Sequence, residues 1–151
     1  MENTSENNTA ALVHLSTLTQ YCIPLGNYIF PMIIWNAKKE KSETIDFHGK
    51  QVLNFQLSWL LYSLLLIIIA IPIFISILLN QLTWNAIINN HEIALKSLTI
   101  DNNIILITTG IMAIITFGVL KITEFFLIIY ATIKASEGER YQYPLTISFI
   151  K

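Results

Sequence analysis

The residues best suited to chemistry follow a short charged loop and begin at His48. Besides Lys50, six polar side chains stand between residues 48 and 62, most of them on one stripe of a helix: His48, Gln51, Asn54, Gln56, Ser58 and Tyr62. This helix continues into an apolar run, and a polar stripe that enters a membrane faces other helices or water rather than lipid. The stripe therefore predicts either hydrogen bonds that hold a helical bundle together or a polar groove, open to the cytoplasm, for a ligand or polypeptide.

A second pair of polar residues, Lys121 and Glu124, interrupts an apolar stretch near the C-terminus. A spacing of three lets the two side chains pair on one face of a helix, and burying either charge alone in a membrane is costly. We therefore expect a structural ion pair, or a Lys121 side chain that reaches toward the membrane surface. A proton or ion relay is the functional alternative, but a relay needs a chain of such groups, and the preceding apolar helix carries no acid.

Other chemistries lack the residues that they need. The predicted topology places His48 on the opposite side of the membrane from His14 and His91, and no Cys or carboxylate pattern completes a metal site. No serine or cysteine stands beside Asp46 and His48 as an activated nucleophile, and no glycine-rich phosphate loop occurs. A net charge of −1 argues against a nucleic-acid partner. We expect no catalytic residue, no metal and no cofactor.

The elements that carry these residues are predicted to be membrane helices. Leu57 to Leu79 is free of charged side chains, and Ile104 to Ile133 contains only Lys121 and Glu124. About 20 apolar residues cross the roughly 30 Å hydrocarbon core of a bilayer. A chain of 151 residues, 54% hydrophobic and 13% charged, cannot hide two such helices inside a soluble domain. The sequence predicts an all-α integral membrane protein in contact with the lipid bilayer.

An earlier apolar stretch, residues 10–37, contains Pro24, Gly26 and Pro31 and cannot form one regular helix. We expect a helix over about 10–22, a break over 23–27 and a second helix over about 28–37. The preferred interpretation is one proline-broken span, which gives a three-span bundle with spans over about 10–37, 50–80 and 104–134. A re-entrant pair of half-helices is the alternative. Residues 1–9 are expected to be a flexible polar tail ahead of a single membrane domain, residues 10–151.

Local signals predict the ends of the later helices and the segment between them. Asp46 is expected to cap a helix that runs from about residue 47 to 80, and Gly138 is expected to end the last span. Between these spans an amphipathic pattern predicts a short helix on the membrane surface, carried by Trp84, Ile87, Ile88, His91, Leu95 and Leu98.

The C-terminal tail alternates apolar and polar residues with a period of two. This pattern predicts an extended segment with one apolar side, formed by Tyr141, Tyr143, Leu145, Ile147 and Phe149. Because a lone strand is unstable, we expect this edge to lie on the membrane, to pack on the protein itself, or to pair with a partner chain.

Positive charge predicts the orientation of the chain. No Lys or Arg precedes residue 38, four lysines follow in the first loop, one lies between residues 80 and 103, and three cations follow the last span. Since positive loops face the cytoplasm, three spans put the N-terminus outside and the C-terminus in the cytoplasm. The first-loop lysines are also expected to contact anionic headgroups: Lys38, Lys39, Lys41 and Lys50.

Several short runs resemble a known family. They are His14-Leu-Ser, Ile-Pro-Leu-Gly-Asn at 23–27, Phe-Pro-Met-Ile-Ile-Trp at 30–35, Asp-Phe-His-Gly-Lys-Gln at 46–51, and Tyr-Pro-Leu-Thr-Ile at 143–147. In these runs the chain resembles small bacterial Tic-twenty-like membrane proteins, a domain of unknown function related to a chloroplast inner-envelope import subunit. The resemblance implies a helical membrane fold in the bacterial inner membrane.

These observations favour a non-catalytic membrane protein that acts as a small helical subunit or scaffold. It would contact other membrane proteins or further copies of itself, in translocation-related or envelope assemblies. A homo-oligomeric channel or transporter subunit is the first alternative, and three helices would need several copies to enclose a pore. An envelope-stress or regulatory membrane protein is the second alternative, and an intramembrane enzyme is the least favoured.

Overall fold

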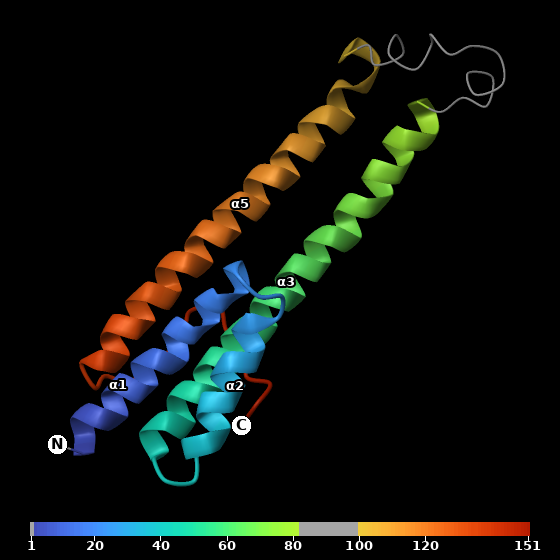
Figure 1. The fold of residues 1–151 in the computed structure, drawn as a ribbon. Helices are drawn as coiled ribbons and strands as arrows, with labels where there is room; N and C mark the ends of the chain where they lie inside the picture. Colours follow the sequence, from blue (N-terminus) through green and yellow to red (C-terminus); the bar gives the residue numbers. More distant parts are fainter. Residues whose placement is uncertain (1, 82–99) are drawn as a thin grey trace. The chain divides into compact units, whose positions relative to one another are not determined.

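The computed structural model describes residues 2–81 and 100–151, which are largely helical (Figure 1). The elements are α1 (Glu2–Leu15), a 3₁₀ helix η1 (Ser16–Tyr21), α2 (Gly26–Lys38), α3 (Glu43–Gln81) and α5 (Ile100–Ser136). The expected all-helical fold is confirmed for these residues. Residues Trp84 to Leu98, which carry the expected surface helix, lie outside the described part of the chain.

Contacts divide the chain into two compact units. The first unit contains residues 1–61 and 121–151, and the second contains residues 62–120. Helices α3 and α5 each contribute to both units. Both chain ends belong to the first unit, as do all the polar contacts discussed below.

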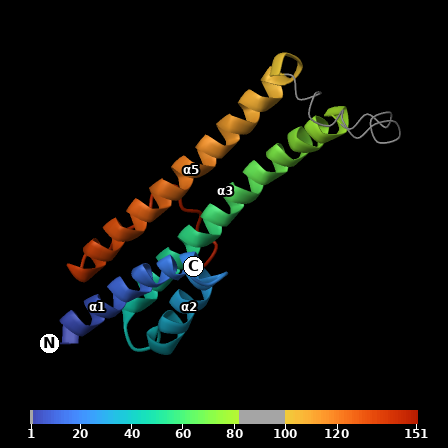
Figure 2. The ribbon, with the colours of Figure 1, turned by 45° about the horizontal axis from the view of Figure 1, so that its top comes forward.

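The N-terminal segment of the first unit is a helical hairpin. Helix α1 contacts α2 through η1 and directly, and the two lie side by side in Figures 1 and 2. Residues 22–25 form the turn, in which Leu25 has a left-handed backbone (φ 62°) just before Gly26. A Cβ atom at residue 26 would lie 2.9 Å from the backbone of Thr19, so only glycine allows this close approach. The break expected at residues 23–27 is therefore present.

Two expectations about this segment differ from the structure. Residues 2–9 are helical within α1, where a flexible tail was expected; Thr9 Oγ1 donates to the backbone oxygen of Ser5 at 2.9 Å within this helix. The segment 10–37 also folds back on itself instead of running on as one broken rod. Helix α2 contains 13 residues, and at 1.5 Å per residue it is about 20 Å long, too short to cross a bilayer.

The two long helices meet the length and composition of membrane spans. The apolar parts of α3 and α5 run over Glu43–Ile75 and Thr108–Ser136, and 11% of the most apolar window in each is buried. A helix in the core of a soluble protein would bury most of that window, so these exposed apolar faces fit a lipid environment. The described residues thus contain two helices able to span a membrane, and the predicted three spans are not confirmed.

The helix ends follow local chemistry. Helix α3 starts at Glu43, earlier than expected, and Ser42 Oγ accepts from the backbone N–H of Ile45 at 3.4 Å. Asp46, the expected cap, lies inside the first turn and pairs with Lys50 at 2.7 Å. Helix α5 ends at Ser136, and Gly138 follows in a left-handed conformation (φ 83°), as predicted for its stop signal.

The second unit, taken by itself, consists of the later part of α3 and the earlier part of α5. Its helices line an apolar hollow of about 410 Å³ that includes three small residues, Ala70, Gly110 and Ala113.

Candidate functional site: a buried polar cluster beneath the C-terminal tail

The predicted polar stripe of α3 lies mostly inside the first unit. His48, Asn54, Gln56 and Ser58 are at most 3% exposed. Gln51 is half-buried. Tyr62 belongs to the second unit and so lies outside this cluster. A buried polar group without a hydrogen-bond partner costs stability, and each of the four buried residues has a partner in the hairpin or in the C-terminal tail.

A row of three side chains joins α1, α3 and the tail. The hydroxyl of Tyr143 lies 2.7 Å from His14 Nδ1, and His14 Nε2 lies 2.9 Å from His48 Nδ1. One consistent arrangement has Tyr143 donating to His14 and His14 donating to His48. The Tyr143 ring also stacks on Phe55 with centroids 4.0 Å apart. This row fixes the start of the tail to the hairpin and to α3.

Burial shifts the pKa values of His14 and Tyr143, the two members of this row that lie outside the span helices. Desolvation, aided by the neighbouring His48, holds the pKa of His14 well below 6.5. Desolvation also raises the pKa of Tyr143 well above 10, with smaller contributions from Tyr141 and Glu124. Both residues are therefore neutral near pH 7, which suits a structural hydrogen bond better than charge chemistry.

Asn54 and Ser58 bind the backbone at the end of the tail. Asn54 Oδ1 accepts from the N–H groups of Phe149 and Ile150 at 3.0 and 2.8 Å, and Asn54 Nδ2 donates to the Ile150 oxygen at 3.0 Å. Ser58 Oγ accepts from the N–H of Ile147 at 2.8 Å. The polar stripe thus holds a polypeptide, as one alternative proposed, but that polypeptide is the protein's own tail.

The tail presents only part of the predicted apolar edge. It has no regular secondary structure, and Leu145 adopts a left-handed conformation (φ 56°) that breaks the alternation. Tyr143 is 5% exposed, whereas Leu145 is 76% exposed. Ile147 and Phe149 are also exposed, and Tyr141 packs edge-on against Tyr130 and Tyr143. Of the three alternatives for the tail, packing on the protein itself is the one that the structure contains.

Gln56 connects α3 to the second arm of the hairpin. Asn27 Nδ2 donates to Gln56 Oε1 at 2.7 Å, and the Tyr28 hydroxyl donates to the Gln56 backbone oxygen at 3.0 Å. Neither Asn27 nor Tyr28 was among the predicted site residues. They lie in an apolar run whose spacing gives no sign of a partner twenty-nine residues away, so only the folded hairpin identifies them.

The predicted pair in α5 is present and has a third member. Lys121 Nζ lies 2.7 Å from Glu124 Oε2, and Gln20 Nε2 of η1 donates to Glu124 Oε1 at 3.2 Å. Glu124 is 1% exposed, whereas the Lys121 side chain is 37% exposed. Both carboxylate oxygens therefore have partners, and the cluster ties α5 to the hairpin.

The four predicted headgroup lysines surround the start of α3 and the end of α2. Lys38 donates to Thr9 Oγ1 at 3.1 Å, and Lys39 lies 5.0 Å above the Trp35 ring. Lys50 pairs with Asp46, which also accepts from Trp35 Nε1 at 2.9 Å, and Lys41 is exposed. Nothing in these contacts tests headgroup binding, which stays a prediction.

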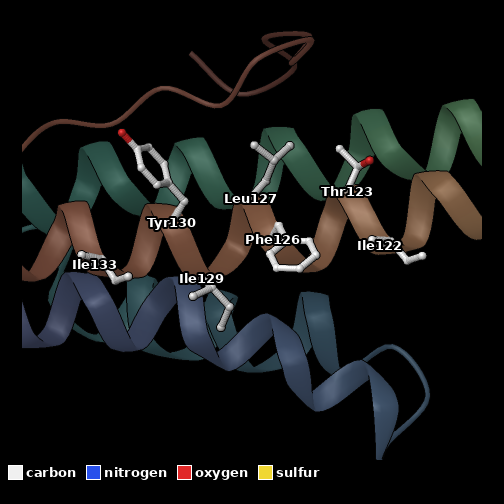
Figure 3. A pocket seen from close by; sticks show the side chains of 7 residues that line it. All are labelled: Ile122, Thr123, Phe126, Leu127, Ile129, Tyr130 and Ile133. Atoms are coloured by element: carbon white, nitrogen blue, oxygen red, sulfur yellow. The ribbon is translucent and has the colours of Figure 1, made fainter.

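The outward face of α5 in the first unit is apolar. Seven residues line a shallow hollow of about 490 Å³: Ile122, Thr123, Phe126, Leu127, Ile129, Tyr130 and Ile133 (Figure 3). Their chemistry suits lipid chains better than a polar substrate. Within the described residues, no group of three His, Cys, Asp or Glu side chains could hold a metal ion.

Comparison with known proteins decides the family. The profile of the magnetosome magnetite crystal formation protein family matches residues 5–150. The chain belongs to this family. The Tic-twenty-like assignment is therefore wrong, because the match covers nearly the whole chain and goes to a different family. No curated protein and no solved structure matches the chain.

Membership in the magnetosome family fits the two long apolar helices and gives a membrane location. It also makes the chain a small membrane protein of a family involved in magnetite crystal formation, and it gives no support to a role in translocation. Two of the short motifs that suggested the other family contribute to the hydrogen-bonded cluster: His48 of residues 46–51, and Tyr143 and Ile147 of residues 143–147.

Proposed function

We propose that this protein is a non-catalytic membrane subunit that contributes to magnetite crystal formation by organising other membrane components. The observation that carries the proposal is the occupation of the polar stripe: Asn54 and Ser58 bind the protein's own tail, and His48 contacts His14. Because the protein's own residues occupy this polar stripe, the stripe supports a scaffold role better than a catalytic role.

The proposed arrangement in the membrane has two spans and an inserted hairpin. An even number of spans places both chain ends on one side. The basic first loop and the cations Lys134 and Arg140, at the end of α5 and the start of the tail, then face the cytoplasm, in agreement with the positive-inside rule. This arrangement replaces the three-span orientation, which put the N-terminus outside.

Two surfaces are proposed to make the contacts. The lysines Lys38, Lys39, Lys41 and Lys50 would meet anionic headgroups, each adding about 1 kcal/mol near an acidic membrane surface. The docked tail displays Leu145, Ile147 and Phe149 outward. Three neighbouring apolar side chains held on a fixed backbone suit a protein partner.

A complementation experiment tests the proposal. In a magnetite-forming host that lacks its own copy of the gene, the wild-type chain should restore crystal formation. A variant with Leu145→Ser, Ile147→Ser and Phe149→Ser should reach the membrane in equal amount but fail to restore it. A matched variant with Ile111→Ser, Ile114→Ser and Ile115→Ser, exposed on α5, should restore it.

Two results would contradict the proposal. Normal crystals with the tail variant would remove the partner surface. Turnover of iron redox state by the purified protein in vesicles, abolished by His48→Ala, would show a catalytic role instead.

A further inference from the structure

The hairpin formed by α1 and α2 is apolar along its outer surface and charged at its base. No Asp, Glu, Lys or Arg occurs between residues 7 and 37, while Glu6, Lys38 and Lys39 stand at the open end. The outward side chains are all at least 41% exposed: Leu12, Leu15, Tyr21, Ile23, Leu25, Ile29, Met32 and Ile33. Such a surface is unsuited to water and matches the acyl chains of a bilayer.

The length of the hairpin matches one leaflet. Helix α2 has 13 residues and is about 20 Å long, whereas a bilayer with its headgroup regions is about 40–45 Å thick. With its base at the membrane surface, the turn at residues 22–25 reaches about the bilayer midplane. The hairpin therefore adds volume to one leaflet and not to the other.

The turn itself points to lipid as the occupant of this surface. Leu25 is 66% exposed and left-handed (φ 62°), a conformation that favours glycine or asparagine. Its side chain packs little against the protein, and its backbone is strained, so in water nothing would compensate for leucine at this position. In the acyl region the same side chain is buried among lipid chains, together with its exposed neighbour Ile23.

We propose that the hairpin acts as a leaflet wedge, which makes the protein prefer membranes that are convex on the side of the hairpin base. Insertion into one leaflet expands the area of that leaflet relative to the other. This difference in area is relieved when the membrane curves so that the expanded leaflet lies on its convex side. This inference rests on the two-span arrangement proposed above. With the base in the cytoplasm, the preferred membrane is a vesicle whose convex face is the cytoplasm.

The test measures protein density on single vesicles of different size. The full chain carries Cys22→Ser and a dye at Glu139→Cys, exposed at the start of the tail, in vesicles of phosphatidylcholine with one-fifth phosphatidylglycerol. Molecules whose base faces outward are selected by quenching with an impermeant quencher. We expect the density per membrane area to be at least about threefold higher on vesicles of about 50 nm than on those of about 400 nm, a range over which inserted helices sense curvature.

Two exposed apolar residues provide a matched pair of variants. Leu25→Gln puts an amide into the acyl region and should reduce the enrichment to near onefold. Ile114→Gln makes a comparable change at an exposed residue of α5, outside the hairpin, and should leave the enrichment intact. Ile33→Gln on the shaft of the hairpin should act like Leu25→Gln, and circular dichroism should show unchanged helix content in all three.

Three outcomes would overturn the wedge. They are equal density of the wild type on all vesicles, enrichment that survives both Leu25→Gln and Ile33→Gln, and disulfide dimers through native Cys22 in dilute vesicles, which would mean that a second copy covers the tip. Failure of the two-span arrangement is separate. Labels at Ser5→Cys and Glu40→Cys would then be reached from opposite sides, whatever the vesicle size.

Discussion

At the scale of single residues, Asn54 is the side chain on which the tail most depends. Its amide makes three hydrogen bonds with the backbone of Phe149 and Ile150. Replacing Asn54 by Ala should weaken tail docking by about 2 kcal/mol, because the freed backbone groups recover only part of that loss by binding water. Carboxypeptidase digestion in nanodiscs should then remove the tail at least about tenfold faster. Gln51→Ala, at a half-buried position in the same helix, is the control, and equal digestion of the two variants would contradict the assignment.

The paired histidines predict that the protein loses stability in mild acid. The folded protein holds the pKa of His14 below 6.5, so the unfolded chain binds more protons as the pH falls through that value. Stability is therefore fully present above pH 6.5 and decreases below it. The midpoint of thermal unfolding in detergent should drop between pH values of about 8 and about 5.

Two variants separate the titration from the hydrogen bonds. His14→Gln should flatten the pH dependence. Tyr143→Phe keeps the stack on Phe55, should cost about 1 kcal/mol, and should leave the slope unchanged. An unchanged or steeper slope in His14→Gln would exclude His14 as the titrating group.

Residue types alone predicted part of this cluster. His48, Asn54 and Ser58 stood out because they are polar side chains at the start of a long apolar helix. Their partners could not be predicted, because Asn54 and Ser58 bind tail residues that are 96 and 89 positions further along the chain and no local pattern identifies them. Tyr143 was assigned to one apolar edge with Leu145 since period-two alternation assumes a straight backbone, and the left-handed turn at Leu145 removes that assumption.

At the scale of elements, two glycines should respond oppositely to the same change. A Cβ at Gly26 would collide with the backbone of Thr19, whereas a Cβ at Gly118 in α5 meets nothing within 4 Å. Gly26→Ala should destabilise the hairpin by about 1–3 kcal/mol, and Gly118→Ala should stabilise α5 by up to about 1 kcal/mol. Thermal unfolding of both variants checks the pair, and similar effects in both would contradict the close packing of η1 on α2.

The connection between α5 and the hairpin depends on a buried carboxylate. Glu124→Ala should destabilise the protein by about 1–3 kcal/mol, since it leaves Gln20 and Lys121 without their acceptor. Lys121→Ala should cost less, because the Lys121 side chain is 37% exposed and screened. Denaturation in detergent measures both. Ion flux in vesicles that is abolished by either variant would favour the channel alternative over this structural role.

Local signals predicted the helices better than their arrangement. The turn around Pro24 and Gly26, the end of α5 at Gly138 and the pairing of Lys121 with Glu124 followed from residue type and spacing. The start of α3 did not, because Ser42 and Asp46 are both good capping residues and only the fold shows that Asp46 is engaged with Lys50 and Trp35. Whether a broken apolar segment crosses or doubles back depends on contacts between its halves, which periodicity does not contain.

At the scale of the whole molecule, the proposed arrangement has two span helices, a half-inserted hairpin and a tail bound to its own chain. Each part explains a feature that the three-span interpretation left open. The absence of Lys and Arg before residue 38 no longer indicates an outside N-terminus, because an uncharged hairpin can enter and leave the same leaflet. The polar stripe no longer needs an outside ligand, because the tail occupies it.

The most direct test of this account is the sidedness of single cysteines in intact cells. In a Cys22→Ser background, Ser5→Cys, Glu40→Cys and Glu139→Cys, the last exposed at the start of the tail, are each treated with a membrane-impermeant maleimide before and after permeabilisation. The two-span arrangement predicts that all three react only after permeabilisation. Reaction of the Ser5→Cys variant in intact cells, with the other two protected, would show that residues 10–37 cross the membrane and would contradict the account.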